Sequence, residues 1–416
     1  MPPSRWALAC VALLFAVAGA LVFAGRLDAA EHMGVPTMQP AFADLRVLTA
    51  ATQAVRDGLD PMHANPGDPW GRLFNYPRVW LALAPLGLAP RHTVGLALFV
   101  WAIAAAGLVW LALQVDRRLG AWAFALSVFS PAWALALERA NTDLLIFGLL
   151  AGAAAAFHLR PRLSMVVVAA AAALKLFPIA ALGLAAEGGA RARRAAELVA
   201  LAFGAYVLVI RADLARIATN TQHWPPLSHG IALAPQWAIR SLDVAPWIMW
   251  SLVVAVVAAV GAGALWLRAR IGRPPVVTAA QSAALRIGAG VHVGAFVLGS
   301  SFDYRLIFLA LATPGLSAWA SAPSRYLRWL ARAALVASVL NVWSLVWRMP
   351  VDWLAGQFAA RALEELSSWA GWALMACVCA VAFDFSVGGS AAGSSPSVRP
   401  ESDLRSVRSP QPRSPA

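Results

Sequence analysis

Long apolar segments follow one another along most of this chain, and they limit what it can fold into. Runs of about 17 to 24 apolar residues recur, close to the length with which a helix crosses a bilayer. Hydrophobic residues make up 60% of the chain and charged residues 13%, which excludes a soluble globular protein. Membrane-spanning helices are predicted at residues 5–25, 92–115, 120–137, 142–158, 196–212, 244–267, 276–299, 304–321, 327–347 and 367–386. The expected fold is all-α, a polytopic bundle of membrane helices.

The charge distribution also fits a membrane protein. The net charge is +13, but the basic residues form short clusters between apolar runs. Cytoplasmic loops of membrane proteins have this pattern, so the basic balance does not indicate nucleic-acid binding. The 19 tryptophans agree, because indole rings favour the membrane interface. Cys10, Cys377 and Cys379 all lie in apolar runs, so neither a disulfide nor a metal site is indicated.

The first apolar run, Trp6 to Ala24, has two interpretations. Small residues at 18–20 interrupt it, as near the cleavage site of a signal peptide. The run is also long enough to cross a bilayer, and the segments after it need membrane insertion in any case. We therefore expect a retained first span.

Two further apolar runs, 77–90 and 164–186, have an ambiguous topology. The first is short and contains three prolines, and the second is interrupted by Lys175 and Pro178. If neither crosses fully, every basic cluster lies on the cytoplasmic side. The clusters are Arg117/Arg118, Arg160/Arg162, Arg191/Arg193/Arg194, Arg268/Arg270/Arg273 and Arg325/Arg328. We expect about ten spans, cytoplasmic termini and two partial or re-entrant elements that line a cavity.

This topology divides the chain into one membrane domain and a tail. The membrane domain covers residues 1–387, with outer segments at 26–91, 138–141, 211–243, 300–305 and 348–366. The tail, 388–416, is rich in Ser, Pro and Arg and is expected to be disordered and cytoplasmic.

The first outer segment contains a candidate catalytic carboxylate. Phe42, Leu45, Leu48 and Val55 recur at helical spacing, which predicts an amphipathic helix at the membrane surface over 41–57. Asp44 falls in its first turn. The carboxylate either complements the helix dipole or acts as a general base on the outer face.

A polar turn between two spans contains four more candidates, Glu138, Arg139, Asn141 and Asp143. One interpretation is local, with Asn141 or Thr142 capping the next helix and Asp143 in its first turn. The other is functional, because acids at the membrane boundary often belong to a site.

Each of three charged residues has two alternative interpretations, one structural and one functional. Lys175 either snorkels to the interface or meets an anion such as a lipid phosphate. Asp303 and Arg305 form either an exposed ion pair or, through Arg305, a phosphate site. The outer segment 211–243 adds aromatic rings and hydrogen-bond donors suited to sugars, at His223, Trp224, His229, Gln236, Trp237 and Arg240.

Several well-known motifs do not occur in the sequence. It has no GxxxxGK[ST] phosphate loop, no HExxH, no GxSxG and no Cys/His metal spacing. ATP-driven transport and zinc proteolysis therefore lack support.

The order of five motifs resembles glycosyltransferase family 87 of the GT-C superfamily. They are ADLRVL, GDPW with FNYP, ERANTDLLIFGLL, ALKLFP and FDYRLIFLALATPG, spread over about residues 40–320. The resemblance implies an extracytoplasmic active site, a polyprenyl-phosphate sugar donor, inverting transfer and a catalytic Asp44. The chain departs from the family pattern at Leu48, Trp70 and Arg78, which concerns the sugar and the acceptor more than the fold.

The resulting expectation is a glycosyltransferase of the bacterial inner membrane with its site facing the periplasm. It would transfer a hexose, with mannose favoured, from the lipid-linked donor to a lipid or glycan acceptor. Lys175, Arg139 and Arg305 would stabilise the departing phosphate, and Glu138, Asn141 and Asp143 would orient sugar hydroxyls or, as a weaker alternative, hold a divalent cation. Arg46, Tyr76, Asp303 and Tyr304 complete the candidate substrate-binding set, and no cofactor is expected.

Two other classes of protein remain open. A transporter or flippase of a lipid-linked or small anionic substrate would use Lys175 and Asp143 but would need no surface base. No internal repeat relates the two halves of the chain, as a repeat-built transporter would require. A non-catalytic assembly protein of the cell envelope would need none of these groups.

Overall fold

The computed structural model describes residues 1–221, 224, 227–271, 274–275 and 277–383. Helices dominate this part of the chain, and the two strands have two residues each. The expected all-α fold is therefore confirmed. The tail at 388–416 lies outside the described residues.

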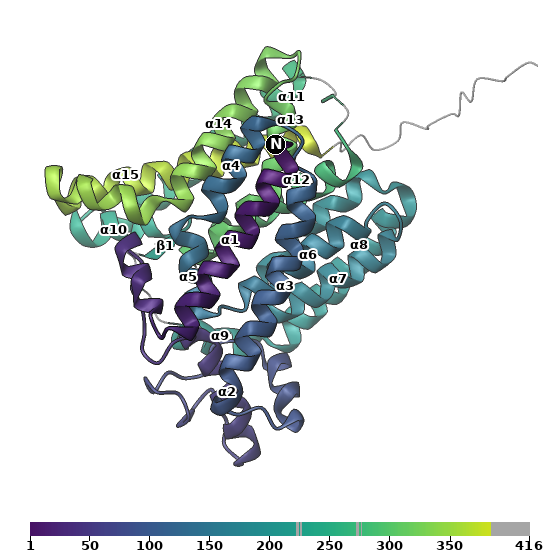
Figure 1. Ribbon diagram of the computed structural model, residues 1–416. Helices are drawn as coiled ribbons and strands as arrows, with labels where there is room; N and C mark the ends of the chain where they lie inside the picture. Colours follow the sequence, from purple (N-terminus) through teal and green to yellow (C-terminus); the bar gives the residue numbers. More distant parts are fainter. Residues whose placement is uncertain (222–223, 225–226, 272–273, 276, 384–416) are drawn as a thin grey trace, which may run out of the picture. The chain divides into compact units, whose positions relative to one another are not determined.

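The elements follow one another as in Figure 1. They are α1 (Pro3–Phe23), η1 (Leu27–Met33), α2 (Ala43–Arg56), η2 (Arg78–Leu86), η3 (Pro90–His92), α3 (Thr93–Leu113), α4 (Arg118–Val128), α5 (Pro131–Arg139), α6 (Asp143–Ala156), α7 (Pro161–Leu174), η4 (Phe177–Glu187), α8 (Gly189–Val209), α9 (Arg211–Asn220), β1 (Ser228–His229), α10 (Leu233–Ser241), α11 (Pro246–Ile271), α12 (Ala279–Val297), β2 (Ser301–Phe302), η6 (Asp303–Phe308), α13 (Leu309–Trp319), α14 (Arg325–Val342) and α15 (Ser344–Ala382). Elements labelled η are 3-10 helices.

Four helices are long and apolar enough to cross a membrane. They are α1, α3 with the preceding η3, α11 and α15. Two bent pairs also qualify if each pair is one span, α4 with α5 at 44° and α8 with α9 at 71°. The described residues thus contain four to six apolar spans by length and composition, and the finer expectation of about ten stays a prediction.

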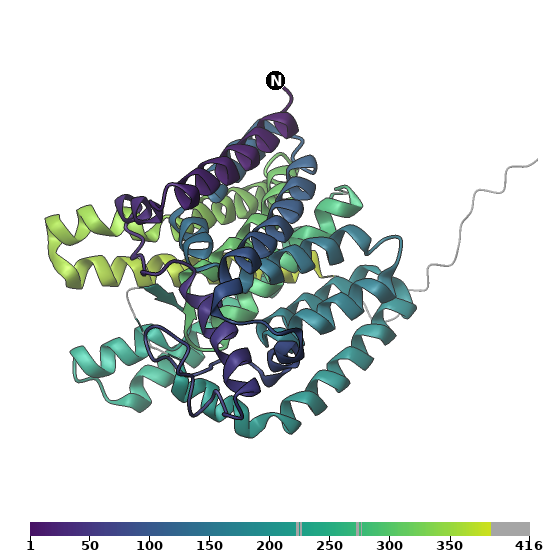
Figure 2. The same cartoon turned by 60° about the horizontal axis from the view of Figure 1, so that its bottom comes forward.

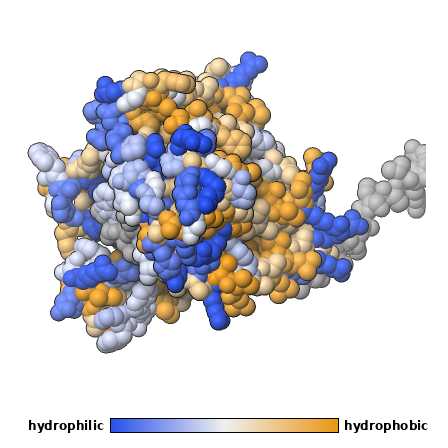
Figure 3. Space-filling model, turned by 90° about the horizontal axis from the view of Figure 1, so that it is seen from below, coloured by the Kyte–Doolittle hydropathy of each residue, from blue (hydrophilic) through white to orange (hydrophobic). Residues whose placement is uncertain are grey.

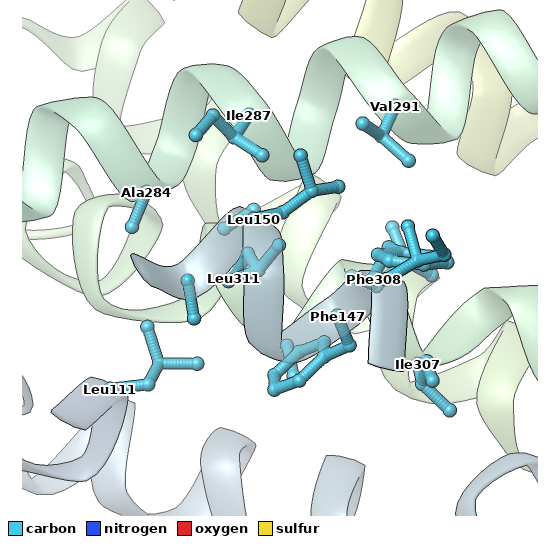
Figure 4. Packing of buried hydrophobic residues seen from close by; sticks show 14 of the residues in the cluster. Leu111, Phe147, Leu150, Ala284, Ile287, Val291, Ile307, Phe308 and Leu311 are labelled. Atoms are coloured by element: carbon cyan, nitrogen blue, oxygen red, sulfur yellow. The ribbon is translucent and has the colours of Figure 1, made fainter. Parts of the chain in front are cut away.

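The core lies where α3, α6, α12 and α13 pack together. Phe147 and Leu150 of α6 meet Ile287 of α12 and Phe308 and Leu311 of the η6–α13 segment (Figure 4). Glycines let these helices approach closely. A Cβ on Gly288 would lie 2.7 Å from the backbone nitrogen of Ala312, so a larger residue there would force α12 and α13 apart.

Three residues that lie next to basic clusters in the sequence, at positions 114, 158 and 187, contact the first half of α12. The contacts are Gln281 Nε2 donating to Gln114 O (2.9 Å), His158 Nε2 against Ala279 O (2.9 Å), and Arg286 Nη2 paired with Glu187 Oε1 (3.0 Å). We call this region, residues 114–118, 158–162 and 187–194, the basic end. The α7–η4 segment leaves the basic end, turns at Lys175 and returns to it.

The opposite end of the molecule carries α2 and the loop after it. Figure 1 places the N-terminus and α2 at opposite ends of the described chain, and Figure 2 brings the α2 end forward. Seen from that end, hydrophilic residues occupy the centre of the face and reach its left edge, and hydrophobic residues lie mainly above, below and to the right (Figure 3). A polar end with apolar surroundings is the surface expected of a protein whose sides face lipid.

The predicted surface helix at 41–57 exists as α2, but its expected environment is wrong. Phe42 and Leu45, which were expected to anchor it in lipid, are almost completely buried in protein. Phe42 packs edge-on against Trp101 of α3, with the ring centroids 5.8 Å apart. Amphipathic spacing specifies that one face is apolar, and here protein rather than lipid covers that face.

The run at 77–90 contains only short helices. It forms η2 and then the start of η3, with a left-handed glycine, Gly87, between them. At about 2.0 Å of rise per residue, η2 is far shorter than the roughly 30 Å hydrocarbon core. Neither η2 nor η3 is therefore a membrane span by itself.

Candidate functional site

Two neighbouring cavities lie at the α2 end, and they share a wall. Their volumes are about 210 Å³ and 380 Å³. Asn75, Tyr76, Phe302 and Tyr304 line both of them. We call the smaller one the Asp44 cavity and the larger one the Lys175 cavity, after the charged residues that line them.

The Asp44 cavity lies under the first turn of α2. Asp44 Oδ2 accepts a hydrogen bond from Asn141 Nδ2 at 2.6 Å, and its Oδ1 lies 3.6 Å from Arg72 Nη1. The carboxylate has a fixed orientation and keeps 18% of its side chain exposed. A carboxylate that is held in place and still accessible has the geometry required of a general base.

Arg72 is a site residue that the sequence analysis missed. Its guanidinium bonds both carboxylate oxygens of Asp68, at 3.2 Å from Nε and 2.8 Å from Nη2, and also donates to Ala43 O. Asp68 in turn accepts from the backbone N–H of Trp70 and Arg72, at 3.0 Å each. The local signal was GDPWGR, because an aspartate before Pro and Gly favours such a side-chain-to-backbone turn.

Asn141 links the two cavities. Its Nδ2 donates to Asp44, and its Oδ1 accepts from Lys175 Nζ at 2.9 Å and from the backbone N–H of Asp143 at 2.8 Å. The amide therefore fixes the relative positions of a carboxylate in one cavity and an ammonium in the other. The N-cap position of α6 is Thr142, and the bond from Asp143 N to Asn141 satisfies a backbone N–H of the first turn of this helix.

Lys175 ends α7 and is 7% exposed, which excludes snorkelling. Its Nζ lies 2.5 Å from Asp143 Oδ1, and Arg305 Nε lies 3.6 Å from Asp143 Oδ2. The rings of Tyr76 and Tyr304 flank the ammonium, with centroids 5.3 Å and 5.6 Å away. Two cations thus share one carboxylate, which leaves a net positive charge to attract an anion.

The rest of the Lys175 cavity is largely apolar. Leu176 precedes η4 and Phe177 begins it, Leu214 and Ile217 come from α9, and Leu298 follows α12. The Arg305 guanidinium lies 4.9 Å from the centre of the Phe177 ring. An anionic head next to an apolar chain is the ligand chemistry that these walls match.

Arg139 lines the Asp44 cavity, whereas Glu138 is buried behind it. Glu138 Oε1 accepts from Met38 N at 2.9 Å, and its Oε2 pairs with Arg139 Nε at 3.0 Å. Arg139 Nη2 donates to Pro36 O at 2.9 Å. The two side chains therefore hold the segment 36–38 along the cavity rim.

Three other predicted residues line neither cavity. Asn141 and Asp143 are fully buried behind the walls, where they contact Asp44, Lys175 and Arg305. Arg46 donates from Nε to Ala41 O at 2.7 Å and supports the turn before α2.

Asp303 belongs to a different cluster. Its side chain is buried, and Oδ1 lies 3.2 Å from His229 Nδ1. Arg305 points the other way, because side chains two residues apart in a helical turn do not share a face. The prediction of an exposed ion pair between Asp303 and Arg305 is therefore wrong. Asp303 instead lines a separate cavity of about 10 Å³ together with Glu364 and Glu365.

The outer segment 211–243 contributes only part of its predicted sugar-binding set. Trp224 lines the Asp44 cavity together with Asn220. His229 pairs with Asp303, Trp237 packs against Phe358 at 4.9 Å between centroids, and Gln236 and Arg240 are exposed on α10. His223 lies outside the described residues.

The wall shared by the two cavities separates two kinds of charged group. An oriented carboxylate lies on one side, and a positively charged pocket with an apolar extension lies on the other. Among the described residues, no three His, Cys, Asp or Glu side chains gather closely enough to hold a metal ion. Comparison with known proteins finds no family model, no curated protein and no solved structure that matches this chain.

Proposed function

We propose that the protein is an integral-membrane glycosyltransferase that moves a hexose from a polyprenyl-phosphate donor to a hydroxyl acceptor. The observation that carries the proposal is the pair of cavities that share Asn75, Tyr76, Phe302 and Tyr304. A transfer reaction needs two substrates that meet at one point, and a shared wall lets a sugar bound in one cavity reach a nucleophile in the other.

The Lys175 cavity suits the donor. A polyprenyl phosphate combines an anion with a long hydrocarbon chain, and the cavity combines Lys175 and Arg305 with Leu214, Ile217 and Leu298. The Arg305 guanidinium presents several N–H donors to a phosphate, while the Lys175 ammonium acts as a point charge. Both cations stabilise the negative charge that develops as the phosphate departs.

The Asp44 cavity suits the acceptor. Asp44 takes the proton of the acceptor hydroxyl while that oxygen attacks the anomeric carbon of the donor sugar. The bond from the anomeric carbon to the phosphate oxygen breaks, and the lipid phosphate leaves with the electron pair. Attack opposite to the leaving group inverts the anomeric centre. The aromatic rings of Tyr76 and Trp224 offer apolar faces to sugar rings at this point.

The proposed topology places the basic end in the cytoplasm and both cavities on the periplasmic side. The contacts of residues 114, 158 and 187 with the start of α12 support a common side for three of the clusters. The reversal at Lys175 supports a re-entrant α7–η4 element within a bundle of about ten spans. We further propose the bacterial inner membrane as its location, mannose as the favoured hexose, and a lipid or glycan as the acceptor.

The test uses purified protein in detergent with polyprenyl-phosphate mannose as donor and a cell-envelope lipid extract as acceptor. Release of the polyprenyl phosphate together with a new mannosylated product supports the proposal. Donor binding without any product under these conditions contradicts it and favours a transporter or flippase. Asp57→Asn is the matched control for variants of Asp44, because Asp57 is exposed just beyond the other end of α2.

A further inference from the structure

The last helix contains a reversal at Gly356. This residue has φ 83° and ψ 164°, values outside the helical range, in the middle of α15. Arg348 Nη1 lies 3.2 Å from Glu364 Oε1, although 16 residues separate them. A straight helix would place residues that far apart at about 24 Å. Residues 344–355 and 357–370 therefore form a helical hairpin with its tip at Gly356.

Four of the five charged side chains of this hairpin pair with one another, and Asp352 is the exception. Arg361 pairs with Glu364 at 3.0 Å and also contacts Glu365, while Arg348 pairs with Glu364. The side chains of Arg361, Glu364 and Glu365 are no more than 13% exposed. Glu364 and Glu365 border the small cavity that contains Asp303, so these two carboxylates are directed towards the protein.

Several large apolar side chains near the tip and on the second arm of the hairpin point outward. Trp353 is 85% exposed, Leu354 73%, Phe358 58% and Leu366 66%. Proteins in water have the opposite pattern, because exposed apolar surface is costly and charges are readily hydrated. In an apolar solvent the pattern reverses, since charges need partners and hydrocarbon surface needs none.

The elements next to the hairpin indicate that its apolar side faces lipid. Figures 1 and 2 both show the hairpin extending sideways from the bundle, across the direction of α1. Phe358 packs against Trp237 of α10, which leads into α11. In the most apolar stretch of α11, only 11% of the residues are buried within the protein. Part of α15 packs against α11. The apolar side of the hairpin thus contacts α10, which leads into a candidate membrane span.

We propose that residues 344–370 form a lipid-binding hairpin that lies in the plane of the bilayer interface, with its apolar side among the acyl chains. Tryptophan near the tip fits this depth, because indole rings favour the boundary between headgroups and acyl chains. An in-plane helix buries its apolar face by about 5–10 Å at that boundary. This inference is independent of the proposed function, and it gives the outer segment predicted at 348–366 a specific environment.

The test places a fluorescent bimane label at single cysteines, in a variant whose Cys10, Cys377 and Cys379 are replaced by alanine. Leu354→Cys and Leu366→Cys report on the two arms of the hairpin. Val254→Cys, 68% exposed on α11, is the lipid control, and Asp57→Cys, exposed just beyond α2, is the water control. Each protein is reconstituted in phosphatidylcholine vesicles and quenched either by acyl-brominated lipid or by iodide present on both sides.

The hairpin labels should behave like the label at Val254→Cys. Acyl bromide should quench them strongly, and iodide should quench them several-fold less than the label at Asp57→Cys. Iodide quenching equal to that of Asp57→Cys would show that the hairpin lies in water and overturn the proposal. Protection from both quenchers would show that a second copy of the chain or another protein covers the hairpin, and it would overturn the proposal equally.

Discussion

The two buried charged clusters of this protein differ mainly in the space beside them. The cluster around Asp44, Lys175 and Arg305 borders cavities of about 210 Å³ and 380 Å³. The cluster around Asp303 and Glu364 borders about 10 Å³, room for roughly one water molecule. Both contain carboxylates paired with cations, at 2.5 Å between Lys175 and Asp143 and at 3.2 Å between Arg348 and Glu364. Charge burial alone therefore does not identify a functional site here, and the open volume distinguishes the two.

The largest expected effect concerns Asp44. Asp44→Asn keeps the shape of the side chain but removes the base, so transfer should fall by about 10²–10⁴-fold. The melting temperature in detergent and the binding of donor should stay near those of the wild type. The rate is measured with polyprenyl-phosphate mannose, with Asp57→Asn as control. A variant that still turns over at more than about a tenth of the normal rate would show that Asp44 is not the base.

In the cluster around Asp303 and Glu364, a substitution should lower stability rather than only the rate of transfer. Glu364→Ala removes the carboxylate that pairs with both Arg348 and Arg361, so the protein should lose about 1–3 kcal/mol of stability. This loss should appear as a lower melting temperature in detergent. Asp352→Ala, at a partly exposed position of the same hairpin, is the control. A variant that melts normally but loses transfer would break the distinction between the clusters.

Lys175 tests whether the positive charge in the larger cavity binds the donor. Lys175→Gln removes the charge but keeps a hydrogen-bond donor, so donor affinity should fall by about ten- to a hundredfold. Arg305 still pairs with Asp143 in this variant, and the protein should remain folded. Affinity is measured by titration of polyprenyl phosphate, with Arg240→Gln on the exposed side of α10 as control. Unchanged affinity would assign Lys175 a structural role.

The smallest effect is expected at an exposed pair outside both clusters. Arg78 Nη2 donates to Asp60 Oδ2 at 2.8 Å, and this bond is the main reason that the pKa of Asp60 lies below its ordinary value. Its stabilisation is therefore present above the unfolded pKa of about 3.9 and is lost as the pH falls through the lower folded value. Both side chains are more than a third exposed, so the contribution should stay below about 1 kcal/mol.

This prediction is checked by melting the wild type and Asp60→Asn in detergent over a range of pH. The small difference between them near pH 7 should begin to shrink at about pH 4 and disappear once the pH falls below the folded pKa of Asp60. A difference that persists in acid would mean that shape rather than charge makes the contact. A difference as large as that of Glu364→Ala would contradict the idea that burial separates strong from weak pairs.

The sequence predicted the helical class and several local features, because these depend on short-range patterns. Long apolar runs predicted membrane helices, and Lys175 with Pro178 predicted the interruption between α7 and η4. The acid at Asp44 was placed at the start of a helix, where α2 begins. Each of these follows from residues within a few turns of one another.

The errors arose where the environment of a side chain depends on distant parts of the chain. The apolar face of α2 was assigned to lipid because spacing does not specify what covers a face. Arg72 was missed because it reaches Asp44 only through the fold of the loop that follows α2. The segment 348–366 was predicted only as an outer segment, because the sequence does not show that Glu364 and Glu365 point into the protein.

The carboxylate between the two cations has a consequence for turnover under the proposed function. Asp143 neutralises part of the charge of Lys175 and Arg305 before any substrate arrives. A departing lipid phosphate therefore does not leave two bare cations in a buried pocket, which would hold the product back. Asp143 therefore lowers the affinity of the pocket for the donor and for the product alike. The empty pocket is stable on its own, so product release does not have to wait for the next donor.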